Sequence, residues 1–438
     1  MGKTIAFHTL GCKLNYAETS QLERRFQAAG YTVVNFKSVA DIYVINTCTV
    51  TAIAEKKGRA AIRSAITKNP DAFVAVIGCF AQIHPDQIAQ IEGVNLILGN
   101  AEKHTLPEKI EEYENTSCST RIVCDVKPLF KQEIFAPSHS EGHRTRAFLK
   151  IQDGCEYFCT YCAIPFARGK NRSRSIEETV SEAETIGKHG VKEIVLTGVN
   201  IGEFGSERNE TFFNLLQALD NVGGVERYRI SSIEPNLLTS EIITFTSKSK
   251  KFLPHFHIPL QSGSDTILKR MNRRYSRSLF ADKVHEIKEH MPDAFIAADI
   301  MVGFPGETNE EFQNMFDFLS NLPLSELHVF PYSERPNTLA AKMSGKIPMH
   351  IRRERSHLLH ELSENKKSQF YAQNKGTLHH ILWESDIENG NIFGFTENYL
   401  RVKTAFCKEK INTITPATLY KQDENGIFSV IFDKNTSL

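Results

Sequence analysis

The sequence predicts an α/β protein in three parts: an N-terminal doubly wound parallel α/β domain (residues 1–135), a central partial (β/α)6 barrel (140–370) and a small C-terminal β-barrel (371–438). Three observations predict this organisation. Short apolar strands alternate with amphipathic helices near the N-terminus, and six further strand–helix units follow. The remaining residues contain short strands separated by turns.

Composition narrows the class of protein. The chain has 438 residues, with 52 basic and 52 acidic side chains, so a nucleic-acid contact would need local patches instead of an overall basic field. No apolar run is long enough to span a bilayer, and the N-terminus has no signal-peptide pattern. We therefore expect a soluble cytoplasmic protein with no membrane partner. Its nine cysteines are expected to be ligands or buried thiols, not disulfides.

The first part alternates strands and helices. Gly30 closes the first helix in the usual position after a helix end, and the chain breaks again at residues 69–71. The expected strands are residues 4–9, 31–35, 41–46, 73–77 and 96–98, and the expected helices are 17–29 and 52–67. This order predicts a parallel, doubly wound sheet.

Three cysteines of this part each follow a predicted strand: Cys12, Cys48 and Cys79. Because the carboxyl ends of parallel strands line the binding edge of an open α/β sheet, the three thiols should meet there. The alternative is three unrelated buried thiols, since free cysteine is often a small core residue. Three equivalent positions favour a metal site. Cys118 and Cys124, in a connector over residues 101–145, and Cys407 have no evident ligand-like partners.

The central part predicts six βα units arranged as an open partial barrel, related to the (β/α)8 design. The expected strands are residues 148–151, 193–197, 227–231, 255–258, 294–302 and 326–330. The expected helices are residues 176–189, 211–221, 239–246, 265–271, 278–290 and 309–319. Sites in such barrels lie at the carboxyl ends of the strands, and glycine, hydroxyl and amide residues follow five of these strands.

A second cysteine trio follows the first of these strands. Cys155, Cys159 and Cys162 have C-x3-C-x2-C spacing, which lets one short loop turn three sulfurs towards one centre. Three protein ligands leave one metal position open, which argues for chemistry, because a closed structural zinc site takes four ligands. The alternative is a structural zinc loop with a distant fourth ligand.

Two basic runs, residues 168–174 and 269–277, are either solvated faces or an RNA phosphate-contacting surface on which Tyr275 stacks a base.

The last part predicts five short strands and a small β-barrel of a type that often binds RNA. The expected strands are residues 377–383, 391–396, 399–402, 411–419 and 427–432. Trp383, Phe393, Phe395 and Tyr399 form either its core or a base-stacking platform, and we favour the core.

Together these features resemble the radical S-adenosylmethionine (SAM) methylthiotransferases over essentially the whole chain. The motifs that carry the resemblance are TLGCKLN at residues 9–15, NTCTV at 46–50, GC at 78–79, QDGCEYFCTYC at 152–162 and PFARG at 165–169. The family has an N-terminal three-cysteine domain, a radical SAM partial barrel and a C-terminal TRAM domain. The last match rests on position and strand count. The start of the first motif and RISSIEP at 229–235 look most like the branch that acts on N6-threonylcarbamoyladenosine at position 37 of tRNA.

The resemblance implies two [4Fe-4S] clusters and SAM. Cys155, Cys159 and Cys162 would hold one cluster, whose open iron would bind SAM. One-electron reduction would cleave this SAM to methionine and a 5′-deoxyadenosyl radical. The radical would take the hydrogen from C2 of the adenine. A second cluster, on the first cysteine trio, would present the sulfur, methylated by a second SAM. The candidates for SAM contacts are Gly198, Asn200, Ser231 and Gln261.

The implied partners are the anticodon stem-loop of tRNA, from which adenine 37 must be lifted, and an electron donor such as flavodoxin or ferredoxin. The sequence also allows two rival functions. One is the same chemistry on isopentenyladenosine-37 tRNA, another base or a ribosomal-protein aspartate. The other is a non-catalytic RNA-binding protein stabilised by zinc.

Overall fold

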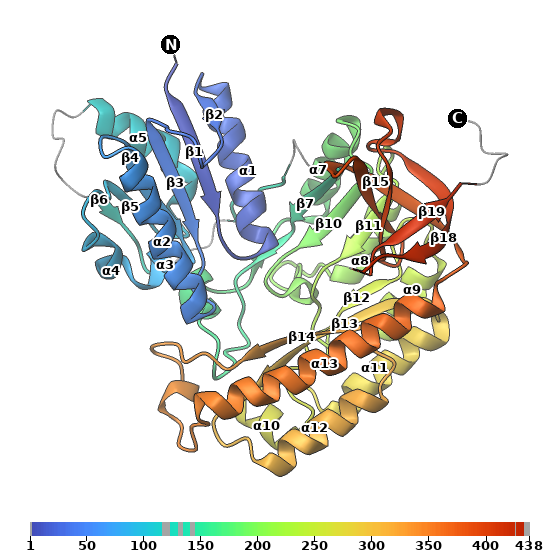
Figure 1. Cartoon of the computed structure of the whole chain (residues 1–438). Coiled ribbons are helices and arrows are strands. Elements are labelled where there is room, and N and C mark those ends of the chain that lie inside the picture. Colours follow the sequence, from blue (N-terminus) through green and yellow to red (C-terminus); the bar gives the residue numbers. More distant parts are fainter. Residues whose placement is uncertain (1, 116–122, 130–134, 141–144, 425, 433–438) are drawn as a thin grey trace. The chain divides into compact units, whose positions relative to one another are not determined.

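The computed structural model describes residues 2–115, 123–129, 135–140, 145–424 and 426–432 (Figure 1). The chain forms two compact units. The first comprises Met1–Ser140, Phe148–Arg174 and Ser333–Lys342, and the second comprises Glu141–Ala147, Ser175–Tyr332 and Met343–Leu438. Both predicted cysteine trios therefore belong to the first unit, although the second trio comes after the last strand of the N-terminal sheet, residues 123–125.

A six-stranded parallel sheet forms the centre of the first unit (Figure 1). The sequence predicts its parallel order and five of its strands, whereas the sixth lies in the expected connector. Its strand order is β2-β1-β3-β4-β5-β6. The strands are β1 (Thr4–Thr9), β2 (Thr32–Val34), β3 (Ile42–Thr47), β4 (Phe73–Gly78), β5 (Leu96–Leu98) and β6 (Val123–Asp125). Because the strand order reverses between β1 and β3, the carboxyl ends of these two strands flank the topological switch point where such sheets bind ligands.

Helices cover both faces of this sheet. On one face, α1 (Lys13–Ala28) and α5 (Leu106–Asn115) pack through Leu22, Phe26 and Ile110. The other face carries α2 (Ala52–Lys68), α3 (Cys79–Ile83) and α4 (Pro85–Ala89). Helix α1 starts earlier than the predicted residue 17, because Cys12 already occupies the extended N-cap position.

The first unit also contains the second cysteine loop. After β7 (Arg146–Lys150), β8 (Gln152–Asp153) pairs antiparallel with β9 (Arg172–Ser173), and the loop and α6 (Ile164–Arg168) lie between these two short strands. The hairpin-like pairing brings the two ends of the loop together. Residues 333–342, which end in the 3₁₀ turn Ala340–Lys342, complete the unit.

Parallel strands form the middle part of the second unit, before the C-terminal strands. β10 (Glu193–Thr197) pairs with β11 (Arg227–Ile230), and β12 (His255–His257), β13 (Phe295–Val302) and β14 (Glu326–Pro331) form a second sheet. Two isolated parallel bridges, Tyr228↔Phe252 and Ser232↔His257, connect the two sheets. The strands therefore continue side by side in sequence order, as expected for successive βα units.

The predicted helices of this unit are present within a few residues of their expected ends. They are α7 (Ile176–Lys188), α8 (Phe212–Asp220), α9 (Ser240–Lys248), α10 (Asp265–Arg270), α11 (Arg277–His290) and α12 (Asn309–Asn321). Ser175 and Thr308 form complete capping boxes with Glu178 and Glu311. Among the helices that the structure describes, none combines the length and the apolar composition needed to cross a bilayer.

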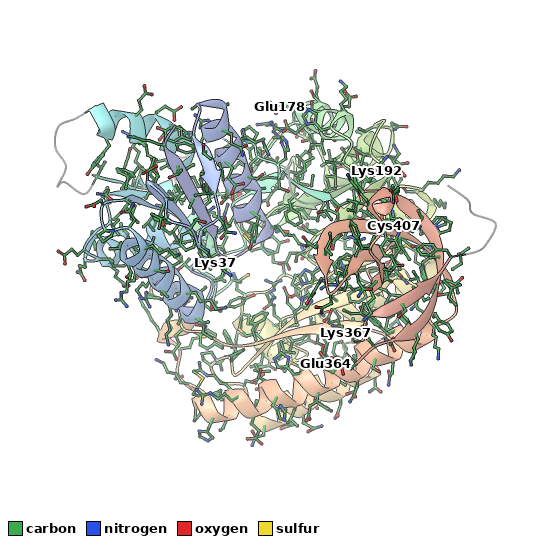
Figure 2. The ribbon with its side chains drawn as sticks, turned by 45° about the horizontal axis from the view of Figure 1, so that its top comes forward. Lys37, Glu178, Lys192, Glu364, Lys367 and Cys407 are labelled. Carbon is green, nitrogen blue, oxygen red and sulfur yellow. The ribbon has the colours of Figure 1, made fainter. Side chains whose placement is uncertain are left out.

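One long helix, α13 (Met349–Gln373), was not predicted. It packs along β14, where Ser363 accepts the backbone N–H of Leu327 at 2.9 Å. Lys367, labelled in Figure 2, forms an ion pair with Glu326 of β14 at 3.2 Å. Several of its buried positions hold charged side chains, such as Arg352 and Arg355, so the helix lacks a simple apolar stripe.

The C-terminal strands close into a barrel with the order β15-β16-β17-β19-β18 (Figure 1). They are β15 (Leu378–Glu388), β16 (Asn391–Thr396), β17 (Arg401–Ala405), β18 (Ile414–Gln422) and β19 (Phe428–Ile431). Trp383 lies fully buried in its core and donates its indole N–H to Thr415 at 2.7 Å. Its predicted core position is therefore correct, and it cannot serve as a stacking platform.

Candidate functional site

The strand ends of the N-terminal sheet bring Cys12, Cys48 and Cys79 together. Cys12 follows β1 as the N-cap of α1, Cys48 follows β3, and Cys79 begins α3 directly after β4. The close approach depends on Gly11, whose φ is +103°: a Cβ there would lie 3.0 Å from the Cys48 Sγ. Cys48 and Cys79 are buried, whereas Cys12 is exposed, so this group of thiols is open on one side.

The thiols also interact electrostatically. Burial raises the pKa of the Cys48 thiol to about 12, and the neighbouring Cys79 and Cys12 contribute to the increase. Three buried or crowded thiolates repel one another, so a cation between them would be needed to hold all three deprotonated. The donor set, three thiols from three strand ends, suits a metal or an iron–sulfur cluster.

Two asparagines supply polar contacts to this trio. The Asn100 side-chain amide donates to the Cys79 Sγ at 3.4 Å and to the Ala167 backbone oxygen at 2.5 Å. The Asn15 amide donates to the backbone oxygens of Leu10 and Thr47. Leu10 lies two residues before Cys12, and Thr47 directly precedes Cys48. Asn100 therefore connects the sulfur of the first trio with α6, the helix that follows the second trio.

Backbone hydrogen bonds fold the second cysteine loop. The Tyr157 and Ile164 N–H groups donate to the sulfurs of Cys155 and Cys162, each at 3.4 Å. The Cys162 N–H donates to the Cys159 carbonyl oxygen at 3.0 Å. N–H donation to sulfur favours the thiolate form, which is the form that binds metals. Cys159 is buried, while Cys155 and Cys162 are partly exposed.

Gly154 allows the loop to begin close to its own end. Its φ is +73°, and a Cβ at this position would lie 1.9 Å from the Lys170 carbonyl oxygen. The Cys155 N–H meanwhile donates to the Gly169 carbonyl oxygen at 3.1 Å. Any side chain at residue 154 would therefore push the ends of the loop apart.

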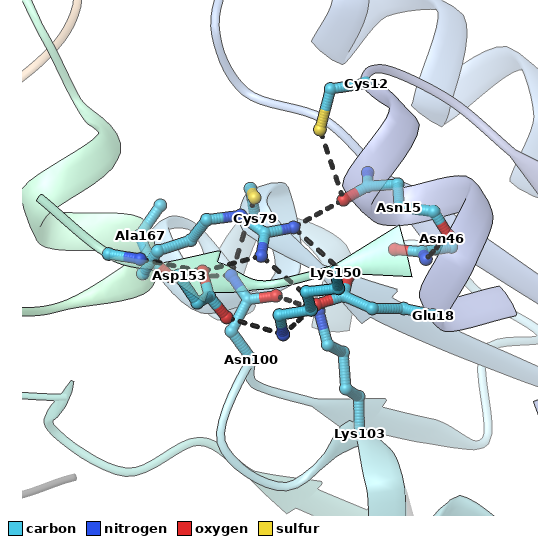
Figure 3. A network of polar contacts seen from close by, with 12 residues as sticks. Cys12, Asn15, Glu18, Asn46, Cys79, Asn100, Lys103, Lys150, Asp153 and Ala167 are labelled. Carbon is cyan, nitrogen blue, oxygen red and sulfur yellow. Dashed lines mark hydrogen bonds and ion pairs between the residues drawn. The ribbon is translucent and has the colours of Figure 1, made fainter. Parts of the chain in front are cut away.

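A buried charge network connects the surroundings of the two trios (Figure 3). The Arg168 Nη1 contacts the Glu18 Oε1 at 3.1 Å and the Asp153 Oδ1 at 2.9 Å, while its Nη2 donates to the Asn15 Oδ1 at 2.6 Å. Lys150 pairs with Glu18 at 2.8 Å and with Asp153 at 2.7 Å. All of these side chains belong to the first unit and are almost completely buried.

Opposite charges set the ionisation of the network. Burial by itself would raise the pKa of Glu18, but Arg168, Lys103 and Lys150 outweigh it and hold the pKa well below its usual value. Lys103 also pairs with Glu18, yet burial lowers the pKa of this lysine to about 8. For Arg168, the nearby carboxylates overcome the effect of burial and raise the pKa, and Cys79 and Cys12 act in the same direction. The guanidinium therefore provides positive charge close to the first trio.

This network corrects one expectation. The run at residues 168–174 is not a continuous solvated or RNA-facing surface, because Arg168 and Arg172 are buried and paired with Asp153. In the run at residues 269–277, Lys269, Arg274 and Arg277 are exposed, so the structure corrects only the stacking role of Tyr275. Arg273 pairs with Glu234, and the Tyr275 hydroxyl donates to backbone oxygens of residues 259 and 260, so this ring is not available to stack a base.

Residues 333–342 contribute contacts that the sequence did not reveal. The Arg335 Nη1 donates to the Glu55 Oε1 at 2.6 Å and to the Thr49 carbonyl oxygen at 3.2 Å. The Ala340 N–H donates to the Thr160 carbonyl oxygen at 2.8 Å. Thr49 follows Cys48 and Thr160 follows Cys159, so one segment supports a loop of each trio. An arginine in a connecting loop carries no pattern that would have indicated this role.

The other predicted site residues lie in the second unit, after neighbouring strands. Gly198 and Asn200 follow β10, Ser231 follows β11, and Gln261 follows β12. Among the described residues, the buried Ser231 Oγ and Gln261 Oε1 have no hydrogen-bond partner. Gln261 has a φ of +67°, and its backbone bonds to Asp299 and Met301 hold it there. Unpartnered buried polar atoms at strand ends are what a ligand would satisfy.

Of the remaining cysteines, the two that the structure describes do not join these groups. Cys124 is exposed, and the Cys407 Sγ donates to the Glu409 Oε2 at 3.2 Å. Cys118 lies outside the described residues.

Two family models match the chain. Residues 4–99 match the Uncharacterized protein family UPF0004, and residues 149–319 match the Radical SAM superfamily. The first model covers all three cysteines of the N-terminal sheet, and the second covers the C-x3-C-x2-C loop and most of the parallel strands that follow. The two matches together account for both cysteine trios.

Relatives over most of their length carry two names, both of tRNA-modifying enzymes. The "Threonylcarbamoyladenosine tRNA methylthiotransferase MtaB" of Bacillus subtilis is 40% identical, covering 99% of this chain and 98% of its own. The Aquifex aeolicus protein of the same name is 39% identical over 92% of this chain and 97% of its own. A "tRNA-2-methylthio-N(6)-dimethylallyladenosine synthase" of Pelotomaculum thermopropionicum is 32% identical over 89% of this chain and 88% of its own.

Solved structures share the fold. The radical SAM methyltransferase TsrM of Kitasatospora setae aligns with a TM-score of 0.55, covering 78% of this chain and 77% of its own, at 14% identity. The cobalamin-dependent SAM radical enzyme OxsB aligns with a TM-score of 0.51, covering 83% of this chain and 56% of its own, at 16% identity. At these identities the likeness concerns the α/β architecture alone.

Proposed function

The chain belongs to the radical SAM methylthiotransferases, the family of the MtaB proteins, and from that premise we propose that it converts N6-threonylcarbamoyladenosine at position 37 of tRNA into its 2-methylthio derivative. The reaction replaces the hydrogen on C2 of the adenine by a methylthio group. The observation that carries the proposal is the pair of cysteine trios within one unit, joined by buried polar contacts. The full-length relatives named for this substrate support the choice of nucleoside.

The family uses two [4Fe-4S] clusters and SAM, and we assign the ligands as follows. Cys155, Cys159 and Cys162 hold the cluster that binds SAM, and Cys12, Cys48 and Cys79 hold the second. The residues present fit these groups: each trio supplies three thiols, which would leave one iron of a four-iron cluster open. When bound, the cluster on Cys155, Cys159 and Cys162 would supply the electron that cleaves SAM to methionine and a 5′-deoxyadenosyl radical.

The chain's own residues stabilise the cluster ligands and contact SAM. Backbone N–H groups donate to the sulfurs of Cys155 and Cys162, which stabilises thiolate ligands. Asn100 does the same for Cys79, and the Arg168 charge offsets the negative charge of the first trio. We propose Gly198, Asn200, Ser231 and Gln261 as SAM contacts; the unpartnered Ser231 Oγ and Gln261 Oε1 support that role.

We further propose that the parts act as in the family. Residues 1–135 form the methylthiotransferase domain, residues 140–370 the partial (β/α)6 radical SAM barrel, and residues 371–438 a TRAM-like domain that binds the anticodon stem-loop. The closed C-terminal barrel supports the last assignment. A tRNA substrate places the reaction in the cytoplasm, and the electron comes from a small donor such as flavodoxin or ferredoxin.

The test is a nucleoside analysis of tRNA from a strain that lacks the gene, complemented with either the wild-type or a C79A gene. Wild type should restore 2-methylthio-N6-threonylcarbamoyladenosine, and C79A should leave the unmodified nucleoside. If the methylthio nucleoside persists without the gene while a methylthio isopentenyl nucleoside disappears, the substrate assignment is wrong. Persistence of both would contradict a tRNA methylthiotransferase.

A further inference from the structure

Three side chains of the second unit form a compact group outside both cysteine trios: His257 on β12, Asp299 on β13 and His328 on β14. Strand register explains their meeting. Asp299 and His328 are direct partners in the β13–β14 ladder, while His257 pairs with Ala297, two residues before Asp299. Because residues two apart on a strand share a face, all three side chains point to the same side of the sheet.

That side is the one that α13 does not cover. Leu327, which precedes His328, is buried and bonded through its backbone to Ser363 of α13. Successive side chains on a strand alternate between faces, so His328 lies on the opposite face, where its side chain is 46% exposed. The group is therefore accessible to solvent, although its members sit on three adjacent strands and not on a loop.

The three donor atoms are unusually close to one another. The His257 Nε2 lies 2.7 Å from the Asp299 Oδ1, and the His328 Nδ1 lies 3.2 Å from the same oxygen. The two imidazole nitrogens are 3.3 Å apart. An ion about 2.1 Å from each of these atoms would lie about 1 Å out of their plane, so the group could ligate a transition metal without rearranging.

The chemistry of the donors selects the ion. Two imidazoles and one carboxylate suit zinc, iron(II) and similar divalent first-row metals, whereas calcium and magnesium require oxygen ligands. Three protein ligands leave further positions open. Metal-bound histidines commonly direct their other nitrogen to a carboxylate, and the Glu326 Oε2 lies 4.0 Å from the His328 Nε2.

We propose that His257, Asp299 and His328 bind one divalent transition-metal ion, distinct from the cysteine-bound clusters. The alternative is a purely hydrogen-bonded group in which both imidazoles donate to one carboxylate oxygen. That arrangement explains the two short nitrogen–oxygen contacts. It does not require the two imidazole nitrogens to lie 3.3 Å apart, whereas a shared metal ion does bring them close. The two possibilities differ in whether the protein binds metal.

The test uses the anaerobically prepared, iron-saturated full chain, equilibrated by dialysis against buffered zinc. Zinc and iron are then counted by mass spectrometry. We expect one zinc per chain in the wild type, and at least a tenfold loss of zinc affinity in D299N and H328Q. H357Q is the matched control, since His357 is an exposed histidine of α13 paired with Glu361; it should keep its zinc. Iron content should be the same in all four proteins.

Zinc-edge X-ray absorption of the same samples checks where the ion is. Nitrogen and oxygen ligands with imidazole scattering would support the proposal. Sulfur ligands would place zinc in a cysteine site and overturn it, as would a wild type that takes up no zinc or a D299N protein that retains it. The partial exposure of His328 makes H328Q a substitution that should fold. None of these readouts depends on methylthiotransferase activity.

Discussion

Arg168 and Glu18, 150 residues apart in the sequence, meet through two contacts of 3.1 Å: Nη1 with Oε1 and Nη2 with Oε2. Glu18 belongs to the helix that Cys12 caps, and Arg168 ends the helix that follows Cys162. The pair is buried, so each charge depends on the other and on Lys150, Lys103 and Asp153. It joins the two cysteine-bearing segments of the first unit.

Arg168→Lys should weaken this connection although it keeps the charge. A lysine cannot form the two-point contact with Glu18 and also reach Asn15 and Asp153. We expect a loss of about 1–3 kcal/mol in the free energy of unfolding. A double-mutant cycle with E18Q in urea should show a coupling of about 0.5–3 kcal/mol. Strictly additive losses would contradict a direct interaction between these two side chains.

Glu18→Gln should be more harmful, because it leaves several buried cations with fewer negative partners. We expect a loss of about 3–5 kcal/mol at pH 7, measured by urea unfolding. Glu108→Gln is the matched control, since it removes the same charge from an exposed pair with Arg25 and should change stability by less than about 1 kcal/mol. Equal losses in the two variants would show that burial of the pair has no special effect.

The same carboxyl group predicts a pH dependence. Because the folded protein lowers the pKa of Glu18, its stabilising contribution is complete above the ordinary carboxyl pKa and is lost as the pH falls below that value. Wild-type stability should therefore fall steeply below about pH 4.3, and E18Q should show a shallower acid slope. Parallel slopes for wild type and E18Q would mean that Glu18 titrates normally.

The positions of both cysteine trios could be predicted from the sequence, because local patterns determine them. Cysteines directly after β1, β3 and β4 predict a common sheet edge, and the C-x3-C-x2-C spacing needs no tertiary information. The buried partners could not be predicted. Arg168 and Arg172 stand in a basic run that resembles a solvated surface, and only folding brings carboxylates to them.

The unpredicted helix α13 illustrates the same limit. Its buried face contains Arg352 and Arg355, each bonded to groups far away in the sequence, such as the carbonyl oxygen of Tyr332 and the carboxylate of Glu307. A search for an apolar stripe misses a helix whose inner face is partly charged. The partner of Tyr275 could not be predicted for a related reason, since its hydroxyl donates to the backbone oxygen of Pro259 in another loop.

Asn100→Leu should change the redox behaviour of the cluster that we assign to the first trio. A hydrogen bond to a ligand sulfur raises a cluster's reduction potential, and this substitution removes the N–H donor to Cys79. We expect the midpoint potential of that cluster to fall by roughly tens of millivolts in a redox titration followed by electron paramagnetic resonance. The cluster of the other trio serves as the internal control. An unchanged pair of potentials would argue against Cys79 as a ligand.

Arg335→Ala tests the segment that supports both loops. The substitution removes the arginine that pairs with the carboxylate of Glu55 and leaves this carboxylate with the Thr49 hydroxyl, which donates to it at 2.6 Å. We expect the unfolding free energy to fall by about 3 kcal/mol. We also expect the cluster assigned to Cys12, Cys48 and Cys79 to be lost more easily. The exposed Arg353→Ala is the control and should stay within about 0.5 kcal/mol of wild type. Similar stability in both variants would remove the supporting role of Arg335.

The most direct test is the reaction itself. The iron-saturated wild-type chain, SAM, a one-electron reductant and tRNA carrying N6-threonylcarbamoyladenosine are incubated without oxygen, and the digested nucleosides are analysed by mass spectrometry. We predict a new 2-methylthio nucleoside at position 37, absent with C12A or C159A and absent when isopentenyladenosine tRNA is the substrate. Product from the isopentenyl tRNA alone, or undiminished product from C12A, would contradict the account.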